Sequence, residues 1–223
     1  YFVELGQVPG GSAVLQQADK FGSGQACAVA PGLKSSAGLL PDGAALDNLG
    51  QLALFSFGQG NLSATPLQIT AMMNTIASGG SYRPPCFVYG VVDEALRLVI
   101  PLQVPEAQRV CREDTAQVLR DMLRSVVEEG IGQDARPREG TAGGKTGTAQ
   151  TGQFDSNGEE LLNYWFSGFY PAEEPRYTIT VLQDGVLEPE TSSAEVFAHI
   201  ADALHVWEQG GAAEAGGPAA KRS

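Results

Sequence analysis

The chain has 223 residues, of which 43% are hydrophobic and 18% charged, and its formal net charge at pH 7 is -12. This composition is typical of a globular protein, and the length suffices for one large domain with a sizeable core. The acidic balance argues against a nucleic-acid partner, which needs clustered Lys and Arg, and against electrostatic binding to anionic lipid.

Two helices and an irregular stretch are predicted in the first third of the chain. The first helix spans residues 13–21, with Ser12 as a possible N-cap and Gly22 as its stop. Residues 22–50 are rich in Gly, Pro, Ser and Ala and show no sustained period, which indicates irregular surface structure.

The second helix begins at Thr65 and ends near Ser78. Thr65 can cap it, Pro66 suits the first turn, and Gln68 stands where a capping box requires it. Its apolar residues are spread nearly all round the helix: Leu67, Ile69, Met72, Met73 and Ile76. We therefore expect this helix to be buried. A short strand is predicted separately at residues 87–92.

An amphipathic helix is predicted over residues 113–129, with acidic Glu113 and Asp114 favouring its N-terminus through the helix dipole. Its apolar stripe consists of Val118, Leu119, Met122, Leu123, Val126 and Val127. Regularity breaks over residues 130–144, where the charged residues are expected to be solvated: Asp134, Arg136, Arg138 and Glu139.

The last third predicts three strands in succession, at residues 145–151, 161–170 and 177–182. The short links between them indicate an antiparallel meander. The fold class is therefore α/β of the α+β kind, an antiparallel sheet with packed helices. No uninterrupted apolar run approaches the roughly 20 residues that span a membrane.

A capped helix follows the third strand, because Ser192 and Glu195 stand at capping-box spacing. A stripe of large apolar residues suits it to packing on the sheet: Val196, Ile200, Leu204 and Trp207. Residues 209–223 are Gly/Ala-rich without core residues, and we expect a flexible tail there.

Cysteine and histidine carry little functional signal. Cys27, Cys86 and Cys111 are widely spaced, which favours buried or incidental thiols, although one disulfide with a spare thiol is possible in an oxidising compartment. His199 and His205 are about 600° apart around a helix, so they do not form a metal site. We expect neither a cofactor nor a metal.

The segment Lys145-Thr146-Gly147-Thr148 is the most informative motif. Lys-Thr-Gly on a strand is one of three signature elements of serine enzymes that handle penicillin. Here the Lys145 charge could hold a carboxylate, and the Thr148 N–H could stabilise an oxyanion. An isolated triplet, however, is better explained as an ordinary exposed strand with one solvated lysine, because such triplets are common by chance.

The other two signature elements are absent. No Ser is followed three residues later by Lys, and none is followed two residues later by Asn. Because a serine without such a base is a poor nucleophile, the chain carries one part of an acyl-transfer site and lacks its nucleophile.

Several segments together resemble the transpeptidase domain of penicillin-binding proteins. These are Phe57-Gly58-Gln59-Gly60 with Thr65-Pro66-Leu67-Gln68, Ile76-Ala77-Ser78-Gly79-Gly80, Gly144 to Gln150, and Trp165 to Pro171. Phe2 to Gly6, Lys20 to Gly24 and Gly38 to Pro41 are similar to further family segments. They occur in family order over residues 1–208, most like class B enzymes of the cell-division, elongation or sporulation type.

The resemblance implies a serine β-lactamase/transpeptidase-like fold in which residues 1–208 form the C-terminal part of the domain. The S-x-N motif would fall just before Tyr1, in an N-terminal part that this chain lacks. By likeness, Lys145 and Thr146 engage the carboxylate of substrate or β-lactam, Gly147 belongs to the same motif, and Thr148 donates an oxyanion N–H. Residues 128–144 depart from the family's usual short glycine-threonine link.

Further expectations concern partners and location. The resemblance implies a peptidoglycan stem peptide and β-lactams as ligands, the missing N-terminal part as a partner, and contacts with cell-wall synthesis proteins. It places the parent protein at the extracytoplasmic face of the bacterial membrane, anchored by an N-terminal segment.

Three functions compete. The first is a fragment of a D,D-transpeptidase for peptidoglycan cross-linking. The second is a non-catalytic, transpeptidase-like module that binds partners in a cell-wall complex. The third, a D,D-carboxypeptidase or β-lactamase, is disfavoured by the class B-like segment from Gly58 to Gln68.

Overall fold

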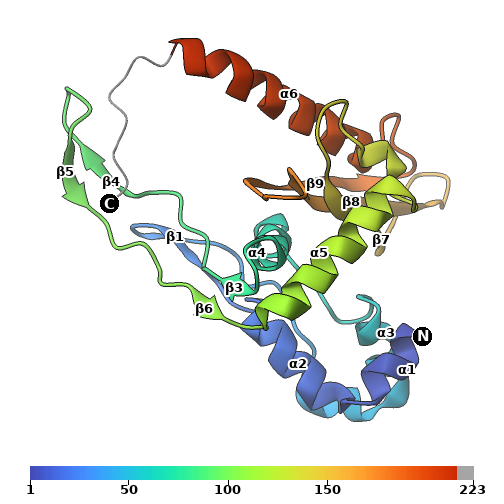
Figure 1. Cartoon of the computed structure of the whole chain (residues 1–223). Helices are drawn as coiled ribbons and strands as arrows, with labels where there is room; N and C mark the ends of the chain where they lie inside the picture. Colours follow the sequence, from blue (N-terminus) through green and yellow to red (C-terminus); the bar gives the residue numbers. More distant parts are fainter. Residues whose placement is uncertain (215–223) are drawn as a thin grey trace.

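The computed structural model describes residues 1–214, and the side chains of residues 1–210. Its centre is a three-stranded antiparallel sheet in the order β7-β8-β9 (Figure 1). The strands are β7 (Gly143–Phe154), β8 (Glu160–Tyr170) and β9 (Tyr177–Val186). The predicted meander is confirmed, and β7 and β9 are longer than predicted.

Helices cover both faces of this sheet (Figure 1). Phe166 of β8 packs on Phe197 of α6 (Ser193–Glu214), with ring centroids 4.8 Å apart. Phe169 lies three positions after Phe166 on the same strand. Successive side chains alternate between the two faces, so Phe169 points to the opposite face of the sheet. There it packs against Met73 and Ala77 of α4 (Pro66–Ala77).

The capping box of α6 is confirmed, since Ser192 N donates to Glu195 Oε2 at 2.8 Å and Glu195 N to Ser192 Oγ at 3.1 Å. The predicted packing stripe is wrong in part. Trp207 is 65% exposed and Ile200 37%, and the buried apolar residues of the helix are Ala194, Phe197, Ala198 and Ala201. The small alanines let the helix approach the sheet closely around Phe166 and Phe197.

A flexible tail was predicted from residue 209, whereas α6 continues through residues 209–214. The remainder of the predicted tail, residues 215–223, lies outside the described residues.

The predicted capping box of α4 is present, and most of the helix is buried or half-buried, as expected. Helix α5 (Glu113–Glu128) lies beside it, and Arg120 Nη1 donates to Ala77 O at 3.0 Å. Two members of the predicted α5 stripe face solvent instead, since Val118 is 51% and Met122 60% exposed.

The segment between α5 and β7 contains a 3-10 turn, η2 (Gln133–Ala135). Its charged residues are exposed, as predicted, whereas Ala135 and Ala142 are buried. Arg138 N donates to Asp202 Oδ1 at 2.7 Å, so the segment is fastened to α6 rather than free in solvent.

The N-terminal elements are α1 (Phe2–Gln7), α2 (Gly10–Lys20), η1 (Gly43–Asp47) and α3 (Leu49–Ser56). Only α2 was predicted. Within residues 22–50, expected to be irregular, there is also a hairpin of β1 (Ala28–Ala30) and β2 (Leu33–Lys34).

Four short strands connect α4 to α5. They are β3 (Ser81–Tyr82), β4 (Gly90–Val92), β5 (Leu98–Pro101) and β6 (Gln108–Arg109). The strand predicted at residues 87–92 is limited to β4, which pairs with β5 in a hairpin that extends from the body (Figure 1). Cys27, Cys86 and Cys111 are unpaired thiols.

Burial of Tyr82 makes a testable contribution to stability at alkaline pH. Desolvation and, secondarily, the neighbouring Cys27 thiol, 3.9 Å from the hydroxyl, together raise the pKa of Tyr82 to about 12. The folded pKa exceeds the usual value of about 10, so this stabilisation is complete below pH 10 and is lost as the pH rises through 12. Denaturant titrations across this window should show a decline that Tyr82→Phe lacks; an identical decline in the variant would contradict the assignment.

Candidate active site

The segment from Lys145 to Thr148 lies on β7, an edge strand of the sheet. Lys145 Nζ donates to Thr146 O at 3.0 Å, and Gln59 Nε2 lies 3.5 Å from Thr148 O, at the outer limit of a hydrogen bond. These two carbonyls therefore point away from β8. Because the N–H and C=O of one residue point to the same side of an antiparallel strand, the N–H groups of Thr146 and Thr148 also face the open edge.

Lys145 presents its charge at this edge. Its side chain is exposed, and the hydrogen bonds of its ammonium to described residues go to the carbonyl and, at 3.3 Å, the hydroxyl of Thr146. Among the side chains of residues 1–210, no ion pair involves Lys145. The ammonium is thus available to an anionic group that approaches β7.

Two glycines allow β7 to lie close to the aromatic side chains of β8. A Cβ on Gly143 would come within 2.5 Å of the Phe169 ring, and one on Gly144 within 2.6 Å of the Phe166 ring. Both glycines are buried. Any side chain there would push the strand that carries Lys145 away from its neighbour.

The Glu173 carboxylate holds the segment that leads into β7. The hydroxyl of Thr141 donates to the Glu173 carboxylate, and Arg124 Nη1 lies 3.0 Å from Glu173 Oε1. The hydrogen bond from Thr141 is the main cause that holds the pKa of Glu173 below its usual value, and a backbone hydrogen bond and the Arg124 charge add smaller contributions. This carboxylate therefore stays ionised at neutral pH and fastens β7 to α5.

Gln59 is a site residue that reasoning from chemistry alone missed. It belongs to the Phe57-Gly58-Gln59-Gly60 segment after α3, where Gly58 and Gly60 both have φ of +82°. This turn delivers the Gln59 amide to the edge of β7 from 89 residues away in sequence. The only signal for it was the order of the motifs along the chain.

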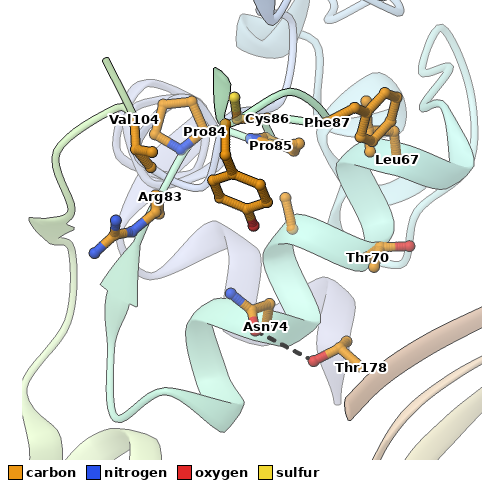
Figure 2. A pocket seen from close by; sticks show the side chains of 12 residues that line it. Leu67, Thr70, Asn74, Arg83, Pro84, Pro85, Cys86, Phe87, Val104 and Thr178 are labelled. Atoms are coloured by element: carbon orange, nitrogen blue, oxygen red, sulfur yellow. Dashed lines mark hydrogen bonds between the residues drawn. The ribbon is translucent and has the colours of Figure 1, made fainter. Parts of the chain in front are cut away.

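A separate hollow of about 500 Å³ lies between α4 and the segment that follows β3 (Figure 2). Its lining includes Asn74, Arg83, Phe87 and Thr178, and none of residues 145–148. Among the described residues, no group of three or more His, Cys, Asp and Glu could hold a metal ion.

Comparisons with known proteins identify the family of this chain. The family model for the penicillin binding protein transpeptidase domain matches residues 1–202. Penicillin-binding protein PbpB of Mycolicibacterium smegmatis is 35% identical over 220 residues, which cover 90% of this chain and 32% of that protein. Stage V sporulation protein D of Bacillus subtilis is 32% identical over 189 residues, covering 82% of this chain and 28% of that protein.

A solved structure is also similar to this chain. Penicillin binding protein 3 of Mycobacterium tuberculosis, crystallised in complex with aztreonam, superposes with a TM-score of 0.78 at 32% identity, covering 94% of this chain and 49% of that one. The chain thus belongs to the penicillin binding protein transpeptidase family and has its fold. It spans about a third of the length of the curated relatives cited above.

Within residues 1–214, no helix is long and apolar enough to cross a membrane.

Proposed function

We propose that residues 1–208 form the C-terminal part of a class B-type D,D-transpeptidase domain that cross-links peptidoglycan. The observation that carries this is the open edge of β7, where the free N–H of Thr148 lies on the same edge that the Lys145 ammonium reaches. A donor for a developing oxyanion and a cation for a carboxylate are two of the groups that acyl transfer from a peptide requires.

The third group, the nucleophile, would come from a serine outside this chain. Its oxygen attacks the peptide carbonyl, and the carbonyl oxygen becomes an oxyanion that accepts from the Thr148 N–H. The terminal amino acid then leaves as an amine that takes up the proton lost by the serine. Lys145 and Thr146 hold the carboxylate of the substrate or of a β-lactam. A second stem peptide attacks the acyl-enzyme through its amine, and the proton lost by this amine returns to the oxygen of the released serine.

The alternative, a non-catalytic module of a cell-wall complex, is not favoured. One similar protein is a peptidoglycan D,D-transpeptidase of Mycolicibacterium smegmatis, 29% identical over 188 residues. A binding module also has no need for a donor edge beside an unpaired ammonium.

The proposal extends to partners and location. The ligands are the peptidoglycan stem peptide and β-lactams, and the remaining part of the domain is supplied by an N-terminal part of the same protein. Such a protein works at the extracytoplasmic face of the bacterial membrane, anchored by an N-terminal segment and in contact with other cell-wall synthesis proteins.

The isolated 223-residue chain should form no covalent adduct with penicillin, because no Ser-x-x-Lys is present. Incubation with a fluorescent penicillin, followed by a denaturing gel, measures this directly. The complete domain, with the upstream serine, should be labelled stoichiometrically under the same conditions. A complete domain that remains unlabelled would refute the proposed function, and a labelled isolated chain would demand an unconventional nucleophile.

A further inference from the structure

A row of side chains crosses the sheet at the position of Lys145. Ser167 of β8 lies opposite Lys145 on one side and opposite Thr180 of β9 on the other. Opposite residues of an antiparallel pair share one face of the sheet, with Cβ atoms about 4.5–5.5 Å apart. The three side chains therefore stand next to one another on the face that is covered by α4.

Hydroxyl groups continue this row onto α4. Ser167 Oγ is 2.8 Å from Thr180 Oγ1, and Thr180 Oγ1 is 2.8 Å from Thr70 Oγ1. Thr70 Oγ1 also donates to Pro66 O at 2.8 Å. We call Ser167, Thr180 and Thr70 the hydroxyl row. Ser167 is only 5% exposed, so its bonds are shielded from water.

The protons of the hydroxyl row have two possible orders, because Thr70 Oγ1 can donate to Thr180 Oγ1 or to Pro66 O but carries one proton. If Thr70 donates to Thr180, then Thr180 donates to Ser167. If Thr70 donates to the Pro66 carbonyl, the direction along the row is reversed and Ser167 donates to Thr180. In both orders Ser167 Oγ keeps a lone pair for its neighbour on β7, and that neighbour carries an ammonium, which can only donate.

We propose that the hydroxyl row positions Lys145. It fixes the face of the sheet beneath the Lys145 side chain, and it offers Ser167 Oγ as a second acceptor for the ammonium, beside Thr146. A lysine side chain loses much rotamer freedom when it is fixed, so a catalytic lysine needs such support. This inference rests on the proposed function and adds Thr70, Ser167 and Thr180 to the same site as positioning residues.

Thr178 provides a matched control. It precedes Thr180 by two residues on the same face of β9, and its hydroxyl donates to Asn74 Oδ1 of α4 at 3.3 Å (Figure 2). It lies opposite Phe169, which pairs with Gly143 rather than with Lys145. Thr178→Val therefore weakens the same junction between β9 and α4 without breaking the hydroxyl row.

A spectroscopic test uses the 223-residue chain and needs no activity. With 13C-labelled lysine, the side-chain resonance of Lys145 is assigned from its loss in Lys145→Arg. We expect this resonance to move in Thr180→Val and in Ser167→Ala, and to keep its position in Thr178→Val and Thr180→Ser. An unmoved resonance in both of the first two variants would overturn the inference.

A kinetic test uses the complete transpeptidase domain. Thr180→Val should slow the acylation step by a β-lactam about tenfold, the effect of one neutral hydrogen bond, while the preceding binding constant is unchanged. Thr180→Ser should restore the rate, and Thr178→Val should acylate like the wild type. Equal acylation rates for Thr180→Val and Thr178→Val would refute the positioning role. A wild-type domain that is not acylated would refute the proposed function instead, and the spectroscopic result would then decide this inference alone.

Discussion

Lys145→Ala in the complete domain should slow acylation by about 10²–10³, the usual cost of losing one preorganised electrostatic contact in an active site. The Lys145 side chain is exposed and forms no ion pair with the side chains described, those of residues 1–210, so its removal leaves no buried group there unpaired. The melting temperature should therefore stay close to that of the wild type. The measurement is the second-order acylation rate beside a thermal melt.

Two further variants sharpen this prediction. Lys145→Arg should not restore the full rate, because a planar guanidinium does not replace a compact ammonium in a tight site. Lys34→Ala removes another exposed lysine, on the β1–β2 hairpin, and should change neither quantity. Near-normal acylation of Lys145→Ala would remove Lys145 from the site, and a collapsed melting temperature would make its role structural.

Local signals in the sequence predicted the elements that carry the site. Alternation of Tyr177, Ile179 and Val181 with threonines defines β9 because one face of that strand packs on a core. The capping boxes at Thr65 and Ser192 depend only on residues three positions apart, and both are formed. Such signals need no knowledge of distant partners.

Errors arose where a distant contact decides the outcome. Large apolar residues suggested that Trp207 faces the sheet, yet the position of Phe166 selects the face that carries Phe197 and small alanines. Helix α1 is only six residues long and contains Gly6, where a Cβ would come within 1.9 Å of Ser56 Oγ. It depends on close packing against α3, which propensity does not register.

The candidate site shows the same difference between features with a local sequence signal and features that depend on distant contacts. Residues 145–148 were predicted from their motif, and the structure places them on an open edge. The contacts that we propose to support them, from Gln59 and from Thr70 to Thr180, join segments 89 and 110 residues apart. A single sequence contains no local pattern for such pairs, so the supporting groups emerge only from the fold.

The side chain of Gln68 is expected to be the most important single polar group for the stability of the N-terminal region. It is only 5% exposed. Its amide nitrogen lies within hydrogen-bond distance of three carbonyls, at 3.2 Å from Gly22 O, 3.3 Å from Gln25 O and 2.8 Å from Ala37 O. Its amide oxygen accepts from Thr65 N at 2.9 Å and completes the cap of α4.

Gln68→Leu keeps a similar volume but leaves these backbone groups without their partner. Each buried polar group left unpaired costs about 1–3 kcal/mol, and loss of the reciprocal cap adds to this. We therefore expect a destabilisation of about 3 kcal/mol, which for a chain of this size lowers the melting temperature by about 6–12 °C. Gln16→Leu is the control, because Gln16 is exposed and, among the described residues, its side chain makes a single 3.4 Å hydrogen bond, to Ser12. Thermal and denaturant unfolding of the two variants measure the difference; equal stabilities would show that Gln68 does not join residues 22–37 to α4.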